Sequence, residues 1–260
     1  MSPRSAAPSA GNMPRPFAEH YDLIYCDKDY KTEASIVLRF WERPGLDRIR
    51  MLELGTGTGN HTMLLAPQVG EMVSVEIDPD FAAVARDRLA ASGLANVRLV
   101  QQPLAALSLE PFDLGCALFH VLNYISPGDM PEFVHDLAAR MKPRGRFIAD
   151  LWNGEAALAD PPRHERRNKN SGATQIRQDI HPALHPDERR VTLNYEIEIS
   201  GPDISACFQE SLQLHLWALS DLEDRFKRAG FGHIQFYDYA RFPGRASKES
   251  WRVWMMAEKT

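Results

Sequence analysis

The segment that constrains the fold most is residues 51–60, MLELGTGTGN, where a short apolar run leads directly into three glycines at alternate positions. Gly55, Gly57 and Gly59 can adopt backbone angles that a Cβ atom disfavours, and they allow a ligand to approach the main chain closely. A glycine-rich turn of this kind joins a buried strand to the N-terminus of a helix. The segment therefore predicts the first strand–loop–helix unit of a parallel α/β sheet, with a ligand at the loop.

A second apolar strand, predicted over 72–77, carries Glu76 near its end. A mononucleotide-binding βαβ unit places the carboxylate that binds the ribose hydroxyls at about this distance from the glycines. Asp78 competes for this role, but it precedes Pro79 and has the form of a helix N-cap. We therefore predict that Glu76 binds a ribose, with its neighbour Ile77 in the same ligand site.

The glycine spacing distinguishes between two classes of nucleotide. A dinucleotide-binding loop has the pattern G-x-G-x-x-G around a pyrophosphate, whereas this chain has G-x-G-x-G, with Asn60 in the place of the last glycine. Glu53 lies just before the loop, and a carboxylate there would repel a phosphate but suit an ammonium or sulfonium group. A nicotinamide-dependent oxidoreductase is accordingly a minor alternative.

The pattern formed by Glu53 and the three glycines, E-x-G-x-G-x-G, resembles the first motif of the class I S-adenosylmethionine-dependent methyltransferases. The resemblance implies that S-adenosylmethionine is the cofactor and that the loop, including Thr56, lies against its methionine part. It also implies that Glu76 holds both ribose hydroxyls. The fold implied is an α/β, Rossmann-like seven-stranded methyltransferase sheet.

The segment 21–30, YDLIYCDKDY, is similar to the Y-D-x-x-Y element that many small-molecule methyltransferases, including sugar N-methyltransferases, carry before the first strand. The resemblance places Tyr21 and Tyr30 against the cofactor or the substrate. Ordinary surface packing of these tyrosines is the alternative.

The stretch after the third strand, QQPL at 101–104, departs from the family pattern. The family commonly has an acid there, near the adenine amino group. Gln102 can offer an amide oxygen instead and Leu104 can pack on the ring, while Pro103 has no N–H to donate. The adenine contacts are thus assigned to Gln102 and Leu104 and otherwise left open.

After the fourth strand, predicted over 112–119, comes FHVLNY at 119–124, at the sheet edge where such folds bind ligands. Phe119 is expected at the cofactor. An acceptor hydroxyl would need a general base, for which His120 is the first candidate and Tyr124 the second. A satisfied buried histidine at a strand end is the alternative. The motifs of nucleic-acid amino and cytosine C5 methyltransferases are absent.

The other elements predicted by the sequence continue the alternation of strands and helices. Ser220 and Glu223 form a capping box for the last helix, which Gly230 ends. Asp150 and Asn153 offer oxygen ligands for Mg²⁺, but two such residues are too few, and no metal is predicted. The remaining elements are strands at 97–101, 146–152, 233–239 and 251–257, a helix at 132–141 and a turn at 142–145.

Residues 154–217 interrupt the alternation and are predicted to form an antiparallel β insertion after the fifth strand that builds the substrate site. The resemblance to small-molecule methyltransferases implies that such an insertion is a lid or a dimer surface. Its second half predicts a hairpin, with strands at 191–199 and 207–217. A basic run at 163–169 is either a solvated loop or a clamp for an acidic group on the acceptor. The expected organisation is a disordered tail at 1–16, a methyltransferase core at 17–153 and 218–260, and the insertion.

The amino-acid composition argues against several classes of binding partner. The formal net charge of −5 provides no positive field for nucleic acid or an anionic membrane, and no apolar run approaches the roughly 18 residues of a membrane span. The three cysteines are far apart and form no C-x-x-C pair, which favours neither a disulfide framework nor a zinc site. We therefore expect a cytoplasmic protein with a small-molecule acceptor and no nucleic-acid or membrane partner, and leave a homodimer open.

The function predicted from these features is methyl transfer from S-adenosylmethionine to nitrogen or oxygen of a small polar acceptor, with a nucleotide-linked amino sugar as the leading example. The alternatives are an RNA or protein methyltransferase and a non-catalytic, cofactor-binding partner subunit.

Overall fold

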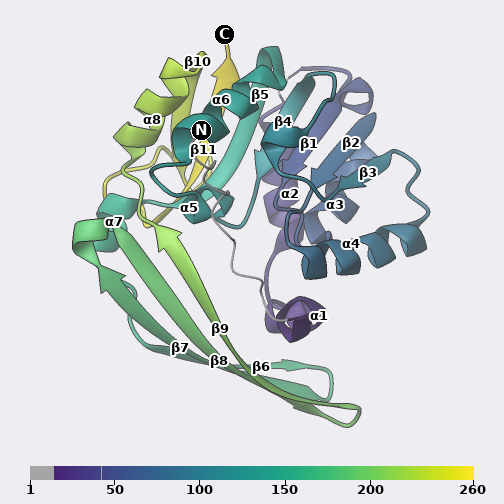
Figure 1. The fold of residues 1–260 in the computed structure, drawn as a ribbon, viewed down its shortest axis with the longest axis vertical. Helices are drawn as coiled ribbons and strands as arrows, with labels where there is room; N and C mark the ends of the chain where they lie inside the picture. The colour runs from purple at the N-terminus through teal and green to yellow at the C-terminus, as the bar shows by residue number, and fades with distance from the viewer. Residues whose placement is uncertain (1–14, 42) are drawn as a thin grey trace, which may run out of the picture.

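The computed structural model describes residues 15–41 and 43–260. The predicted disordered tail lies outside these residues except for Arg15 and Pro16, which begin helix α1 (Arg15–Ile24). The described chain forms a seven-stranded sheet with helices on both faces and a separate four-stranded antiparallel sheet (Figure 1). The predicted fold class is confirmed. Within the described ranges, no helix combines the length and apolar character needed to span a bilayer.

The larger sheet consists of β1 (Arg50–Leu54), β2 (Glu71–Val75), β3 (Val97–Val100), β4 (Phe112–Ala117), β5 (Met141–Trp152), β10 (Phe231–Asp238) and β11 (Arg252–Lys259). Its order is β10-β11-β5-β4-β1-β2-β3. The pairs from β3 to β5 are parallel, whereas β11 is antiparallel to both β5 and β10. The order reverses between β1 and β4, and ligands of open α/β sheets bind at such a point, outside the carboxyl ends of the strands.

The helices around this sheet are α2 (Tyr30–Arg39), α3 (Asn60–Leu65), α4 (Pro79–Ser92), α5 (Val121–Tyr124), α6 (Met130–Ala139) and α8 (Leu219–Arg228). Because alternate strand residues point to opposite faces, each face has its own core. Met51 and Met72 pack with α2 and α3 on one face. Leu52 and Val73 belong to the cluster of α6 and α8 on the other.

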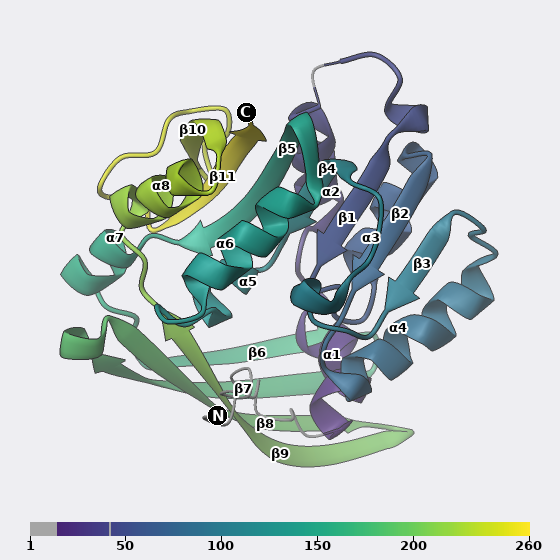
Figure 2. The same cartoon turned by 45° about the horizontal axis from the view of Figure 1, so that its top comes forward.

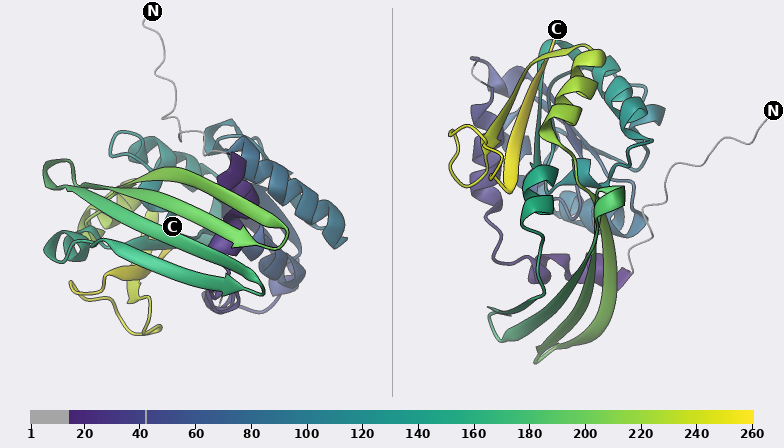
Figure 3. Two further views of the ribbon diagram at one scale, coloured as in Figure 1. Left: turned by 90° about the horizontal axis from the view of Figure 1, so that it is seen from below. Right: turned by 90° about the vertical axis from the view of Figure 1, so that its left-hand side faces the viewer.

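The smaller sheet consists of β6 (Glu165–Ser171), β7 (Thr174–His185), β8 (Arg190–Gly201) and β9 (Ile204–His215), reached through α7 (Gly154–Ala159). It lies across the carboxyl edge of the larger sheet, with α1 against it (Figures 2 and 3). Phe17 and Ile24 of α1 pack with Ile180, Leu193 and Ile197 of this sheet. We call the face that carries these three residues the inner face.

Most predicted elements are present, but two boundaries near β5 are wrong. The helix predicted to reach residue 141 ends at Ala139, because Met141 pairs with Phe112 of β4 and already belongs to β5. The turn predicted at 142–145 lies inside β5, where the register shifts and Arg144 has a φ of 62°.

Two further local predictions are wrong. The capping box does not form, because α8 begins at Leu219, with Ala218 at the N-cap and no side-chain cap. The basic run at 163–169 is not a solvated loop, because most of it forms the edge strand β6, paired with β7 along its whole length. By contrast, Asp78 is the N-cap of α4 as predicted, and its side chain accepts from the backbone N–H groups of Asp80 and Phe81.

Candidate active site

The glycine loop between β1 and α3 has the backbone conformation that its sequence predicts. Gly55, Gly57 and Gly59 have φ values of 72°, 58° and 86°, a region that strains other residues. At Gly55 a Cβ atom would lie 2.5 Å from Cγ2 of Val121. The first glycine therefore permits both the turn and the close approach of the loop to α5.

A small open cavity of about 30 Å³ lies beside this loop, at the point where the strand order reverses. It brings together six of the predicted cofactor residues from α1, α2, the loop and the end of β4. The lining residues are Tyr21, Tyr30, Gly55, Thr56, Gly57, Thr58, Asn60, His61, Leu118 and Phe119.

Glu76 follows β2 and faces the loop. Its carboxylate accepts hydrogen bonds from the backbone N–H of Gly57, at 2.7 Å, and of Asp78, at 3.0 Å. Burial raises the pKa of Glu76 to about 7, although the backbone N–H groups of Asp78, Gly57 and Ile77 oppose the shift. An ionised carboxylate has about four acceptor sites, so two remain for hydroxyl groups of a ligand.

Glu53 lies beneath the loop and outside the cavity lining, with 2% of its surface exposed. Its Oε2 atom accepts from the hydroxyls of Thr62, at 2.5 Å, Ser74, at 2.9 Å, and Thr56, at 3.4 Å. Burial raises its pKa. These contacts tie the loop to α3 and β2, so the structure gives Glu53 a role in holding the loop.

Several predicted site residues lie apart from the cavity lining, namely Ile77 beside the ribose site, Gln102 and Leu104 at the adenine, and the second candidate base Tyr124. Ile77 is 55% exposed and Tyr124 40% exposed, and they are the exposed large apolar residues among those described. Leu104 is buried in the core beneath β3, whereas Gln102 is exposed. The structure thus leaves Ile77 accessible to a flat ligand but places Leu104 inside the protein.

The backbone is strained where β4 ends. The strand predicted to reach residue 119 stops at Ala117, because Phe119 and His120 adopt left-handed φ values of 66° and 55°. Two consecutive residues of this kind without glycine are rare and concentrate at functional sites. The backbone N–H of Phe119 donates to Oδ1 of Asp150, which holds this conformation in place.

His120 lies at the start of α5, largely buried, between the rings of Phe119 and Trp152. Its Nδ1 atom is 3.4 Å from Oδ2 of Asp150. Burial lowers the pKa of His120, although Asp150 opposes the shift. The imidazole is therefore neutral near pH 7 and able to take up a proton.

A buried charged network behind the cavity is the feature that the sequence analysis missed. Arg252 of β11 binds Asp150 from Nη2 at 2.7 Å and Glu33 at 3.2 Å. Glu33 also accepts from Nε2 of His61, at 2.6 Å, and from Lys28. Burial alone would raise the pKa of Glu33, but these bonds and charges lower it to about 2. A signal was present, since Glu33 shares the helix face of the apolar Ile36, Val37 and Phe40.

Asp150 and Asn153, considered above as magnesium ligands, use their side-chain oxygens elsewhere. Asp150 accepts from Arg252 and Phe119. Asn153 is the N-cap of α7 and accepts from the N–H of Glu155 at 3.2 Å.

Helix α1 is held in place by polar contacts with the glycine loop and α4 and with strand β6. Asp22 accepts from the Thr58 hydroxyl, at 2.7 Å, and the Asn60 amide, at 2.8 Å, and pairs with Arg88 of α4. On the other side, Lys169 of β6 donates to the carbonyl of Ile24 at 2.9 Å. Tyr21 of this helix lines the cavity, and its ring packs edge-on against that of Phe81.

Comparison with known proteins agrees with this geometry. Residues 51–145 match a family model described as a methyltransferase domain. This part of the chain is therefore similar to methyltransferase domains. The resemblance to methyltransferases inferred from the glycine motif is thus confirmed, and one solved structure of the same fold, CalS10, was determined with S-adenosylmethionine bound.

Relatives of the methyltransferase domain act on different acceptors. A protein-L-isoaspartate O-methyltransferase of Anaeromyxobacter dehalogenans is 36% identical over 48% of this chain and 57% of its own length. The chain therefore matches only a little over half of that relative. A dTDP-3-amino-3,6-dideoxy-alpha-D-glucopyranose N,N-dimethyltransferase of Streptomyces fradiae is 24% identical over 82% of both chains.

The likeness to solved methyltransferase structures extends over most of the chain. The structure of SAM-bound CalS10, an amino pentose methyltransferase of Micromonospora echinaspora, covers 92% of this chain and 96% of its own. Its TM-score is 0.72 at 19% identity, which establishes a common fold.

Proposed function

We propose that this protein transfers the methyl group of S-adenosylmethionine to nitrogen or oxygen of a small polar acceptor, with the amino group of a nucleotide-linked amino sugar as the leading example. The observation that supports the proposal is the cavity beside the glycine loop, whose lining includes Tyr21, Tyr30 and Phe119. Glu76 accepts a hydrogen bond from Gly57 of this loop, and His120 directly follows Phe119 in the strained turn.

The residues around the cavity fit the cofactor. The two free acceptor sites of Glu76 suit the ribose hydroxyls. The rings of Tyr21, Tyr30 and Phe119 line the remaining space, and aromatic faces attract a cation such as a sulfonium. When bound, S-adenosylmethionine would supply a methyl group attached to a positively charged sulfur. The acceptor atom would approach the methyl carbon opposite the sulfur, and the sulfur would leave as part of a neutral thioether.

His120 is the proposed general base. It accepts the acceptor's proton at Nε2, while Asp150, 3.4 Å from Nδ1, stabilises the imidazolium that forms. This distance is longer than an ordinary hydrogen bond and would shorten once the ring is charged. Asp150 acts here as a positioning residue, itself held by Arg252. Tyr124 remains the second candidate.

The second sheet is the proposed lid over the acceptor. Gln178, on the inner face, is fully buried, and neither amide atom has a partner among the described residues. Glu210 lies opposite Tyr195 on the same face, and its Oε2 atom is also buried without a partner there. Such groups are costly unless a ligand satisfies them. We propose that they bind hydroxyl or amino groups of the acceptor.

The relatives support an amino sugar as acceptor, because one enzyme that matches most of this chain N-methylates a dTDP-linked amino sugar by its name. A cytoplasmic location is part of the proposal and is consistent with the free thiols of all three cysteines.

Thermal-shift binding with S-adenosylhomocysteine, ATP and NAD tests the cofactor, and a methylation assay over nucleotide-linked amino sugars tests the acceptor. We expect stabilisation by S-adenosylhomocysteine alone. A shift with NAD and none with S-adenosylhomocysteine would overturn the proposal.

A further inference from the structure

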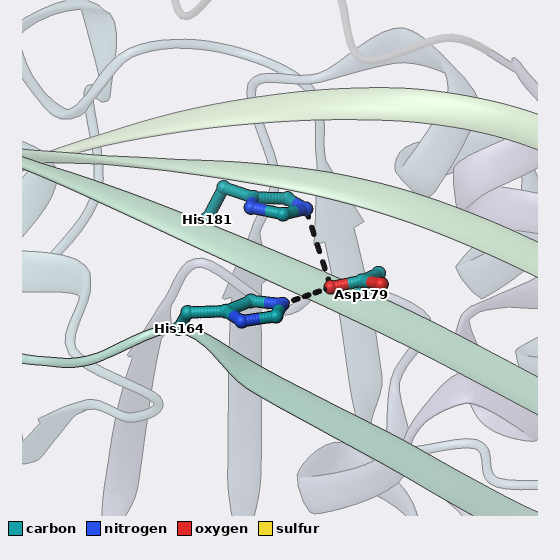
Figure 4. Close-up of side chains that lie close together, drawn as sticks. All are labelled: His164, Asp179 and His181. Atoms are coloured by element: carbon teal, nitrogen blue, oxygen red, sulfur yellow. Dashed lines mark hydrogen bonds and ion pairs between the residues drawn. The ribbon is translucent and has the colours of Figure 1, made fainter.

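Two histidines and one aspartate meet on the outer face of the second sheet, away from the cavity. His164 precedes β6, and Asp179 and His181 lie on β7 (Figure 4). Nε2 of His164 and Nε2 of His181 both point at Oδ1 of Asp179, the latter at 3.2 Å. One potential ligand atom from each of the three residues lies within 4.8 Å of the others.

Both imidazole rings present Nε2 to the same carboxylate oxygen of Asp179. The two imidazoles are nearly parallel, 11° apart, with centroids at 4.5 Å, so their Nε2 atoms converge on one carboxylate oxygen. A carboxylate paired with two histidinium rings would bring two like charges face to face, which is unfavourable. A cation held between the three atoms would replace that repulsion with three bonds to neutral or negative donors.

The three potential ligand atoms favour one class of metal ion. Two imidazole nitrogens and one carboxylate oxygen suit Zn²⁺ and its neighbours in the first transition row, whereas Ca²⁺ and Mg²⁺ prefer all-oxygen sites. Arg166 binds the other carboxylate oxygen, Oδ2, from Nε at 2.9 Å and so fixes the orientation of Asp179 while leaving Oδ1 for the ion. The side chains of His164 and His181 are 52% and 51% exposed, which gives an ion access from solvent.

We propose that His164, Asp179 and His181 bind one divalent transition-metal ion of the zinc class, with a fourth position open to water. The ion fastens the start of the edge strand β6, which pairs only with β7, to its neighbour. Sequence spacing did not indicate this site, because the pairing of β6 with β7 brings His164 close to Asp179 and His181, and the site includes no cysteine. The site is independent of the proposed methyl transfer.

The test uses the full chain, metal-free and without a polyhistidine tag, titrated with Co²⁺ and with Zn²⁺. We expect one Co²⁺ per chain, with the visible absorption of a site containing nitrogen ligands, and a Zn²⁺-dependent rise in melting temperature. The His164→Gln/His181→Gln double variant should lose both signals and keep the far-ultraviolet circular dichroism of the parent. His135→Gln, an exposed histidine of α6, is the matched control and should behave as the parent.

Equal binding by the parent and the double variant, or no stoichiometric binding by the parent, would overturn the proposal. In that case the cluster is a set of surface ion pairs. Neither metal binding nor the melting temperature depends on methylation. Absence of a metal site would therefore leave the proposed methyl transfer unaffected, and absence of methyl transfer would leave the proposed metal site unaffected.

Discussion

The guanidinium of Arg252 binds one oxygen of Asp150, Oδ2, through both Nε, at 3.0 Å, and Nη2, at 2.7 Å. Asp150 is completely buried, and its other oxygen accepts the N–H of Phe119. This pair therefore links the last strand of the chain to the strained turn that carries His120.

Arg252→Gln should lower the free energy of unfolding by about 3–5 kcal/mol, because it leaves the buried Asp150 and Glu33 charges without their shared partner. Urea denaturation measures the change. Arg48→Gln, at an exposed arginine, should alter the stability by less than about 0.5 kcal/mol. Equal effects of the two substitutions would contradict this account of the network.

Gly55→Ala should destabilise the protein more than Gly93→Ala. Both glycines have a φ near 70°, which costs alanine about 1–2 kcal/mol. A Cβ atom at Gly93 meets nothing within 4 Å, whereas at Gly55 it meets Val121. Adding Val121→Ala should therefore recover part of the loss in the Gly55 variant and none in the Gly93 variant. Thermal unfolding distinguishes these outcomes.

Binding of S-adenosylhomocysteine should strengthen as the pH rises from 6 to 8. The carboxyl of Glu76, with a pKa of about 7, is mostly protonated at pH 6 and mostly ionised at pH 8, and the ionised form is the better acceptor for ribose hydroxyls. We expect the Kd to fall about tenfold across this range in calorimetric titrations. Glu76→Gln should bind more weakly, by about 1–3 kcal/mol, and with no such pH dependence.

The raised pKa of Glu76 also predicts that its contribution to the free energy of unfolding decreases as the pH rises, whereas cofactor binding should strengthen. Its pKa in the folded protein is above the ordinary value of 4.5, so the folded state binds the proton more tightly than the unfolded state. The contribution of Glu76 to stability is therefore complete below pH 4.5 and is lost as the pH rises through about 7. The difference between the parent and Glu76→Gln in urea denaturation, measured from pH 5 to 8, isolates this contribution. A constant difference would show that the pKa is not raised.

His120→Ala should reduce turnover of a hydroxyl acceptor by about 10²–10⁴-fold, the usual contribution of a general base. A neutral amine needs little help and should lose much less. The test compares kcat for the two kinds of acceptor, with S-adenosylhomocysteine affinity as the check that the site is intact. Unchanged turnover of the true acceptor in a folded variant would remove His120 from the mechanism as a base.

The parts of the site that the sequence predicted are local in the chain. The glycine pattern and the proline after Asp78 dictate their own backbone conformations, so the loop, the N-cap of α4 and the position of Glu76 follow from a few adjacent residues. The Glu33–Arg252 contact joins residues 219 positions apart, and no spacing rule reaches that far. The second sheet was also predicted only in part. Apolar and polar residues alternate clearly in β8 and β9, but β6 is almost entirely polar, and it is a strand because it pairs with β7.

Helix α1 is anchored through Asp22 to the glycine loop and through Lys169 to the edge strand of the second sheet. Tyr21 lines the cavity from this helix, so a movement of α1 away from the glycine loop would have to break the bonds of Asp22. The helix thus couples the shape of the cavity to the position of the second sheet, because its other contact is with Lys169 of β6.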